Sequence, residues 1–187
     1  MKKEAGWIYS PRVISVLAEL ARKPLTPMQL RVNTCMTKNN YVNIILKKLE
    51  AEGIVKCMNP EEKIGRVFCI NPQSRKMIEG IFRKRKIRQE ITPLPKLNWT
   101  AYGRLSCRYC RQLRKVLKKA YELKHEGREM TVSNLKEKLP GMATSNLYRA
   151  LDRLIELRAM ACKNTGPREF MITEEGLAIM EFDSVVI

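Results

Sequence analysis

The fold of this chain is decided by two stretches of sequence: LTPMQLRVNTCMTKNNYVNIILKKLEAEGIVKC, which is Leu25–Cys57, and MTVSNLKEKLPGMATSNLYRALDRLIELRAMAC, which is Met130–Cys162. The two stretches align without a gap at an offset of 105 residues. Few aligned positions are identical, but apolar residues recur at the same places in both. A repeat at a fixed offset indicates two copies of one structural unit, so we expect two similar domains.

The first copy predicts three helices followed by a pair of strands. Serine and proline at residues 10–11 favour a helix start, and Thr26 with Gln29 has the pattern of a capping box. Apolar residues at helical spacing mark the inward faces, and Gly53 suits the end of the third helix. The expected elements are a helix from Ser10 to about Ala21, a short helix from Thr26, a helix at about Asn39–Glu52, and strands at Ile54–Met58 and Arg66–Ile70.

The second copy predicts the same order of elements, beginning with a longer helix. Between the copies, residues 72–91 can form a basic helix, and the following TPLPKLNW segment is extended by its prolines. The expected fold is mainly α with small β-hairpins (α+β), as domains at 1–78 and 101–187 joined by a basic, proline-containing linker at 79–100. The expected elements of the second copy are helices at about Arg104–Lys124, Thr131–Leu139 and Thr144–Leu157, and strands at Met160–Lys163 and Glu169–Ile172.

The charge of the chain narrows the class of partner. The sequence has 36 Lys and Arg residues against 19 Asp and Glu, a formal net charge of +17. A field of this size attracts polyanions, although it does not by itself separate DNA from RNA or from an anionic membrane. The sequence shows no signal peptide and no apolar run long enough to cross a bilayer. We therefore expect a soluble, cytoplasmic, nucleoid-associated protein without a membrane partner.

The sequence gives little support for catalysis, a metal or a cofactor. It has six cysteines but a single CxxC pair, Cys107 and Cys110, and one histidine, His125. A structural zinc site needs four ligands, so we expect no metal, while redox activity of the pair stays open. The sequence contains no glycine-rich phosphate loop and no nucleophile–base arrangement. We therefore expect a protein that is not an enzyme and needs no cofactor.

The order of elements is similar to that of winged helix-turn-helix domains. The strings NNYVNIILKKLEAEGIV and SNLYRALDRLIELRAM resemble the recognition helix and wing of prokaryotic regulators of the multiple-antibiotic-resistance and arsenic-repressor types. The resemblance covers about residues 10–77 and 104–180, and the compact, lysine-rich sequence resembles archaeal regulators. It implies two winged helix-turn-helix domains in tandem, and a transcription regulator that binds specific sequences of double-stranded DNA at promoters.

The third helix of each copy offers the side chains that such a function needs. A helix fits the major groove, where Asn pairs with adenine, Arg with guanine, and an apolar side chain contacts the thymine methyl. The hairpins place basic residues where a wing reaches phosphate or the minor groove. The candidate DNA-binding residues of the first copy are Thr37, Lys38, Asn39, Asn40, Tyr41, Asn43, Ile44, Lys47, Lys63 and Arg66, and those of the second are Thr144, Ser145, Asn146, Tyr148, Arg149, Arg153 and Arg168.

Other functions and partners remain open at this point. A replication initiator can also resemble tandem winged helices, and a winged-helix protein-interaction module would show an exposed apolar patch. Double-stranded DNA is the expected partner, with the transcription machinery and a second copy of the chain as further candidates. Two domains on one chain can engage successive major grooves about 34 Å apart. The second domain, with its longer first helix and lower charge, is the better candidate for dimerisation.

Overall fold

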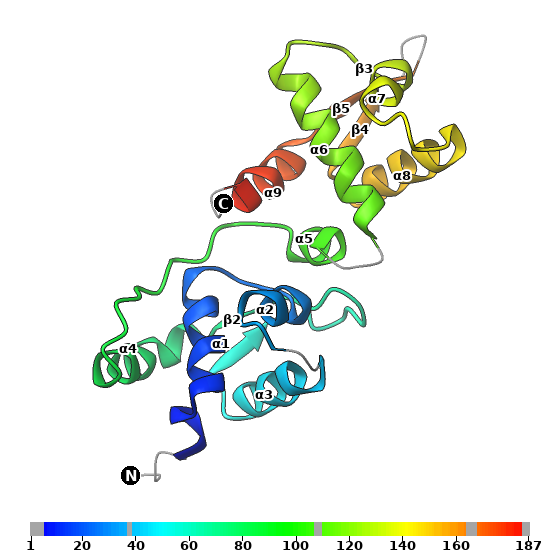
Figure 1. Cartoon of the computed structure of the whole chain (residues 1–187). Coiled ribbons are helices and arrows are strands. Elements are labelled where there is room, and N and C mark those ends of the chain that lie inside the picture. The colour runs from blue at the N-terminus through cyan, green and yellow to red at the C-terminus, as the bar shows by residue number, and fades with distance from the viewer. Residues whose placement is uncertain (1–5, 37–38, 107–109, 164–167, 185–187) are drawn as a thin grey trace. The chain divides into compact units, whose positions relative to one another are not determined.

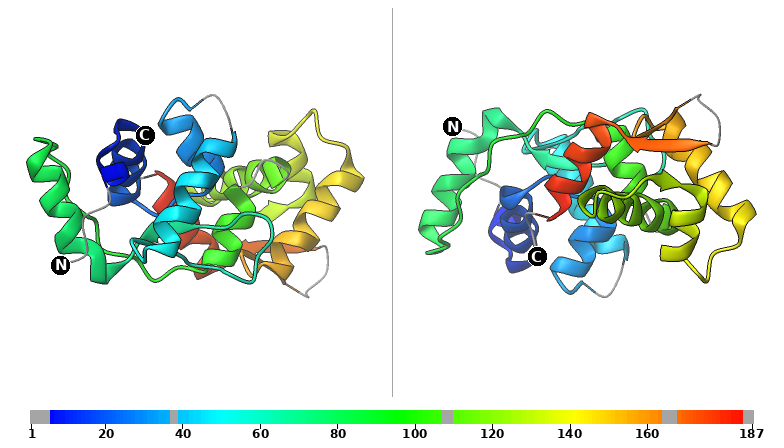
Figure 2. Two further views of the ribbon diagram at one scale, coloured as in Figure 1. Left: turned by 90° about the horizontal axis from the view of Figure 1, so that it is seen from below. Right: turned by 90° about the horizontal axis from the view of Figure 1, so that it is seen from above.

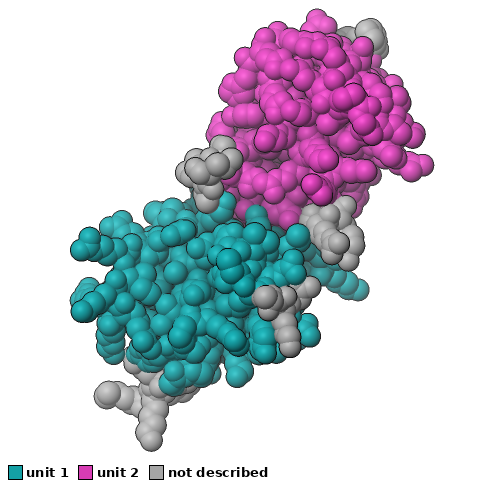
Figure 3. All heavy atoms as spheres, in the orientation of Figure 1, with its two compact units in different colours: residues 1–96 teal, residues 97–187 magenta. Residues whose placement is uncertain are grey.

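The computed structural model describes residues 6–36, 39–106, 110–163 and 168–184. The chain divides into two compact units, Met1–Lys96 and Leu97–Ile187, which are coloured separately in Figure 3. In the described residues each unit combines helices with one small antiparallel sheet. The structure is therefore mixed α and β, in agreement with the expected α+β class.

The first unit places two short strands beside a group of helices (Figure 1). Its core is formed by apolar residues such as Leu17 of the first helix, Leu46 and Leu49 of the third, and Ile78 of the fourth, all of which are buried. These positions follow the helical spacing of the sequence, so each helix turns one apolar stripe inward. The elements are η1 (Gly6–Tyr9), α1 (Pro11–Arg22), α2 (Pro27–Asn33), α3 (Asn39–Ala51), β1 (Val55–Cys57), β2 (Phe68–Ile70), η2 (Pro72–Ser74) and α4 (Arg75–Lys84).

The predicted capping box at the start of α2 is confirmed. The backbone N–H of Gln29 donates to Thr26 Oγ1 at 3.3 Å, and the N–H of Thr26 donates to Gln29 Oε1 at 2.8 Å. Thr26 is buried, so this reciprocal pair satisfies backbone donors that water does not reach. The capping box fixes where α2 begins, and with it the start of the α2–α3 pair.

The end of α3 is set by Gly53, as the sequence predicts. Gly53 has a φ of +68°, and the N–H of Ile54 donates to the carbonyl of Leu49 at 2.8 Å, which closes the helix in a Schellman turn. An added Cβ at Gly53 or at Gly80, within α4, would meet nothing within 4 Å. The two glycines therefore differ only in backbone conformation.

We predict opposite effects on stability for the two substitutions. Gly53→Ala forces a side chain into the left-handed region and should lower the free energy of unfolding by about 1–2 kcal/mol. Gly80→Ala removes a flexible residue from a helix interior and should raise it by about 0.5–1 kcal/mol. Urea unfolding in a Trp99→Phe background, followed by the fluorescence of Trp7, which lies in the first unit, measures both. Equal effects of the two substitutions would contradict this account of the α3 terminus.

The second unit follows the same order of helices around a three-stranded sheet. Helix α6 contacts α7, α8, α9 and β5, and α7, α8 and α9 surround it in Figures 1 and 2. The strand order is β3-β5-β4, with both pairs antiparallel. The elements are α5 (Trp99–Ser106), α6 (Arg111–His125), β3 (Met130–Thr131), α7 (Val132–Lys138), α8 (Thr144–Glu156), β4 (Met160–Lys163), β5 (Glu169–Ile172) and α9 (Glu174–Ser184).

The strand pairing has the same register in both units. The β1–β2 and β4–β5 pairs join equivalent residues, and the isolated bridge to Leu25 in the first unit matches the short strand β3 in the second. The two units thus share local pairing as well as element order. The equivalent pairs are Leu25–Phe68 and Met130–Phe170, Val55–Ile70 and Met160–Ile172, and Cys57–Phe68 and Cys162–Phe170.

The helix expected at about Arg104–Lys124 is present as α6 but begins only at Arg111, and a separate helix, α5, ends at Ser106. Asn98 starts α5 by accepting a hydrogen bond from the N–H of Ala101 at 3.0 Å. The rings of Trp99 and Tyr102 then pack edge-to-face against Phe182 of α9, at centroid distances of 5.9 and 5.3 Å. Docking on α9, which the sequence reading did not foresee, thus stabilises α5 as a separate helix.

The linker expected at residues 79–100 is largely part of the first unit. Ile81, Phe82 and Ile91 are buried in its core. The N–H of Thr92 donates to the carbonyl of Ala21 at 2.8 Å. The division between the units falls after Lys96, so the basic segment packs on the first unit and does not hang free between two domains.

Candidate nucleic-acid interface

One side of α3 is polar and exposed, and the other side is buried. Asn40, Asn43 and Lys47 are exposed, as is the apolar Ile44, which has half of its surface accessible. The predicted inward residues of α3 are confirmed, since all four are buried in the core. The exposed face is therefore free to contact a partner. The buried residues are Val42, Ile45, Leu46 and Leu49.

The exposed face of α3 borders a hollow of about 510 Å³. Residues that were predicted to contact DNA line this hollow from two places that are far apart in sequence. Most of them belong to α3, and the other is Arg66, which precedes β2. The structure thus brings five of the candidate residues around one surface depression. Its lining is Pro27, Asn40, Asn43, Ile44, Leu46, Lys47, Arg66 and Phe68.

Arg66 is held against the body of the first unit. Its guanidinium pairs with Glu50 at 3.1 Å and lies 5.0 Å from the centre of the Phe68 ring. Its Nε also donates to Cys57 Sγ at 3.4 Å. The β1–β2 hairpin of the first unit therefore presents Arg66 at the rim of the hollow beside α3, whereas Lys63 is exposed in the loop between β1 and β2. Contact of either residue with phosphate stays a prediction.

The β1–β2 loop is organised by Asn59, which the sequence reading did not single out. The side chain is buried, its Oδ1 accepts from the N–H of Val67 at 2.8 Å, and its Nδ2 donates to the carbonyl of Gly65 at 3.1 Å. Two hydrogen bonds from one side chain thus close the loop that carries Lys63. The Asn-Pro pair at residues 59–60 is the signal that could have found it, because such pairs favour turns.

We predict that Asn59→Ala destabilises the first unit by about 1–3 kcal/mol, because the buried N–H of Val67 loses its acceptor. Urea unfolding monitored by Trp7 fluorescence in the same Trp99→Phe background measures the change. Asn33→Ala is the matched control, since Asn33 is exposed and its hydrogen bond to Glu19 should contribute less than about 0.5 kcal/mol. A loss at Asn59 no larger than at Asn33 would show that the loop does not depend on this side chain.

The exposed face of α8 is the corresponding surface of the second unit. Thr144, Ser145, Tyr148 and Arg149 are exposed, and the core-facing residues predicted for this helix are all buried. Asn146 is partly buried, so it is less accessible than expected. The buried residues of α8 are Leu147, Ala150, Leu151 and Leu154.

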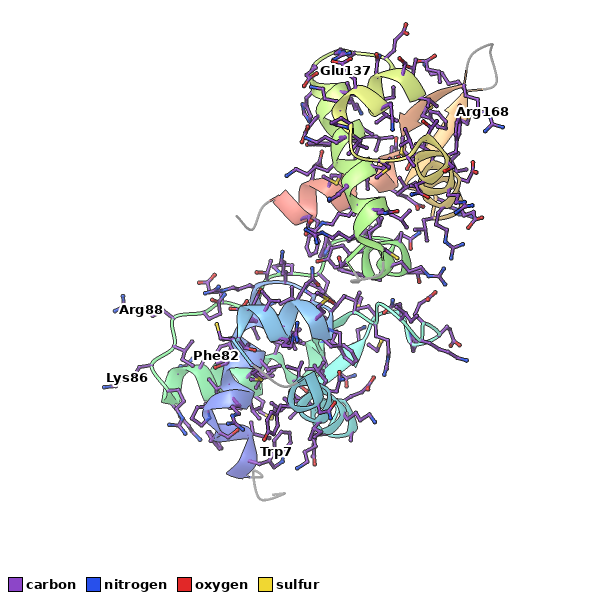
Figure 4. The ribbon with its side chains drawn as sticks, turned by 45° about the vertical axis from the view of Figure 1, so that its right-hand side comes forward. Trp7, Phe82, Lys86, Arg88, Glu137 and Arg168 are labelled. Carbon is purple, nitrogen blue, oxygen red and sulfur yellow. The ribbon has the colours of Figure 1, made fainter. Side chains whose placement is uncertain are left out.

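Two further candidates on this unit have partners within it. The guanidinium of Arg168 lies 5.9 Å from the centre of the Tyr148 ring, so the hairpin and α8 meet at this pair. Figure 4 shows Arg168 at the end of the sheet where the chain enters β5. Arg153 forms an ion pair with Glu156 one turn further along α8. Arg153 therefore shares its charge with a neighbour, whereas no ion pair to Arg149 is present in the described part of the chain.

Some candidates fall outside the described residues. Thr37 and Lys38 lie outside them. For Asn39, which is the first residue of α3, only the backbone is described. Cys107 lies outside them as well, so its relation to Cys110 is not defined.

The described residues contain no cluster of three or more metal-ligating side chains. Burial raises the pKa of Cys69 to about 11, so this thiol stays protonated and unreactive at neutral pH. His125 is exposed and its ring packs on Tyr121.

No helix in the described ranges is both long and apolar enough to cross a membrane. Comparison of the chain with protein-family models, with curated proteins and with solved structures finds no significant match.

Proposed function

We propose that the chain is a tandem winged helix-turn-helix protein that binds double-stranded DNA in a sequence-specific way and regulates transcription. One observation carries this proposal: α3 and α8 occupy equivalent places in two units and each exposes a polar face beside a hairpin arginine. The net charge of +17 supports a polyanionic partner. Because an α-helix fits the major groove, two such faces suit two contacts with duplex DNA.

The side chains around the α3 hollow match the edges of A·T base pairs. An exposed Asn43 can donate to and accept from adenine with its amide, as can Asn40, while Ile44 can contact a thymine methyl. Lys47 is exposed on the same face and supplies charge for phosphate. The first unit is therefore proposed to read an A·T-containing sequence.

The exposed face of α8 suggests a different base preference. Arg149 is exposed and can bind guanine through its O6 and N7 acceptors. Asp152, also exposed, repels phosphate but can accept a hydrogen bond from the cytosine amine. The stacking of Arg168 on Tyr148 places another cation at the edge of this face. The second unit is therefore proposed to favour G·C-containing sequence.

A protein-interaction module is the second candidate function, and two residues of α2 favour it. Met28 and Val32 have 39% and 61% of their surface exposed and lie one helical turn apart. Such a pair suits a partner protein such as a component of the transcription machinery. If this candidate holds, Val32→Ser should abolish capture of that partner without changing DNA affinity.

The experiment that tests the proposed function is selection from a random duplex DNA library at near-physiological salt, with sequencing of the retained fraction. An enriched motif, with an A·T-containing and a G·C-containing part, is the expected result. Binding without any motif would replace sequence-specific regulation with general DNA coating. Absence of binding would leave the protein-interaction function as the better one.

A further inference from the structure

The segment that ends α4 carries the densest positive charge of the first unit. Residues 83–88 read RKRKIR, so five of six positions are basic. All five basic side chains are exposed, whereas Ile87 packs against the core. The nearest acidic residue on the helix, Glu79, pairs with Arg75 at 3.0 Å. Within the described residues no carboxylate pairs with Arg83, Lys86 or Arg88.

This segment has a fixed backbone. The N–H of Ile87 donates to the carbonyl of Phe82 at 2.9 Å and that of Lys86 to Arg83 at 3.1 Å, which is the hydrogen bonding of a Schellman turn. Phe82 and Ile87 both pack on the core, as the hydrophobic contact of that motif requires. The guanidinium of Arg85 donates to the carbonyl of Tyr9 at 2.8 Å. The positive charges therefore lie on a hydrogen-bonded turn at the end of α4.

Lys86 stands where the backbone favours glycine. Its φ is +55°, while the equivalent positions after α3 and α6 are Gly53 and Gly127, with φ of +68° and +67°. A lysine there points outward, and Figure 4 shows Lys86 and Arg88 extending away from the ribbon. Replacing Lys86 by Gly therefore removes one charge and relieves the backbone at once. This makes it a variant that changes charge without harming the fold.

The cluster lies on a different side of the unit from the exposed face of α3. In all views of Figures 1 and 2, α1 lies between α4 and α3. A contact made by residues 83–88 is therefore separate from the base-reading contact proposed for α3. Arg83, Lys86 and Arg88 are exposed cations without an ion pair among the described residues, and such cations suit the phosphate groups of a nucleic-acid backbone, which attract them by charge.

We infer that Arg83, Lys86 and Arg88 form a second, sequence-independent contact to the phosphate backbone of duplex DNA. The inference rests on the proposed function only for the class of ligand, since base reading by α3 is not needed for it. The DNA bound by this contact would lie outside the sequence that α3 is proposed to read. Each phosphate contact releases condensed counterions, so the contact should appear in the salt dependence of binding.

The test compares the full chain with the variant Arg83→Gln, Lys86→Gly and Arg88→Gln, using a duplex of scrambled sequence and fluorescence anisotropy between 50 and 200 mM salt. Loss of three contacts should reduce the slope of log K against log salt by roughly 2 to 3. Over that range the wild type should then lose roughly 40-fold more affinity than the variant. The matched control is Lys56→Gln, Lys96→Gln and Lys124→Gln, which removes the same charge from exposed positions elsewhere.

Each outcome decides the matter. A reduced slope in the cluster variant but not in the control supports the contact, even if no sequence motif is ever selected and the proposed function fails. Equal slopes in variant and control overturn it, even if the wild type binds a selected motif and the proposed function stands. Binding of the wild type to vesicles of equal parts phosphatidylglycerol and phosphatidylcholine, but not to duplex DNA, would also overturn it in favour of a membrane surface.

Discussion

Gly176→Ala is expected to lower the free energy of unfolding of the second unit by about 3 kcal/mol. A Cβ at this position would lie 2.1 Å from the carbonyl oxygen of Ala159 and 2.8 Å from Cγ2 of Ile172. The clash is with backbone, so no side-chain rotation relieves it. Gly176 is buried in the first turns of α9, and the helix would have to move away from the sheet.

The carbonyl group of Ala159 cannot move away easily, because hydrogen bonds fix both the carbonyl and the N–H of this residue. It accepts a hydrogen bond from the N–H of Thr173 at 3.2 Å, and the N–H of Ala159 donates to the carbonyl of Leu154 at 2.9 Å, within the turn that closes α8. The side chain of Thr173 in turn accepts from the N–H of Gly176 at 3.1 Å. A methyl group at Gly176 therefore disturbs the end of α8, the start of α9 and the sheet together.

The measurement is urea unfolding in a Trp7→Phe background, so that Trp99 alone reports. Trp99 is a probe of α9, because its ring packs on Phe182. Gly141→Ala is the matched control, since an added Cβ there meets nothing within 4 Å. It should change stability by less than about 0.5 kcal/mol. A shift for Gly176→Ala as small as that of the control would mean that α9 does not dock on the sheet in solution.

The sequence predicted the helices that have a strong period and a clear cap. The bounds of α8 and of both strands beside it agree with expectation to within a residue, and the capping box of Thr26 is present. These features depend on neighbours in sequence. The strands of the first unit are shorter than expected: the N–H of Met58 still donates to the carbonyl of Val67 at 2.8 Å, but the N–H of Val67 donates to Asn59 Oδ1 and not to the partner strand.

The features that the sequence did not reveal depend on distant contacts. Strand β3 is only two residues long and exists through its pairing with Phe170 and Glu169, while α9 has no clear apolar stripe of its own. The ion pair of Arg66 with Glu50 joins residues that no local pattern relates. The exposed face of α3 could be predicted because burial of the opposite face follows the helical period, but the hollow beside it could not.

The other large effect expected is on binding. If Asn43 reads a base as proposed, Asn43→Ala should weaken binding to the selected motif by about 1–3 kcal/mol, because alanine cannot replace the two hydrogen bonds that the amide would make to that base. Arg149→Ala should have a similar effect at a different base pair, since it lies on the other unit. Binding to scrambled DNA should change little for Asn43→Ala, which removes no charge.

The control for this prediction is Lys63→Ala, in the loop between β1 and β2. A phosphate contact carries no sequence information, so the variant should weaken motif and scrambled DNA alike and reduce the salt slope by about 1. Repeating the library selection with each variant separates the roles, because only a base-reading residue changes the motif. If Asn43→Ala and Arg149→Ala relax two separate base pairs, both units read DNA. If Arg149→Ala leaves the motif unchanged, only the first unit does, and the second is free to bind another copy of the chain.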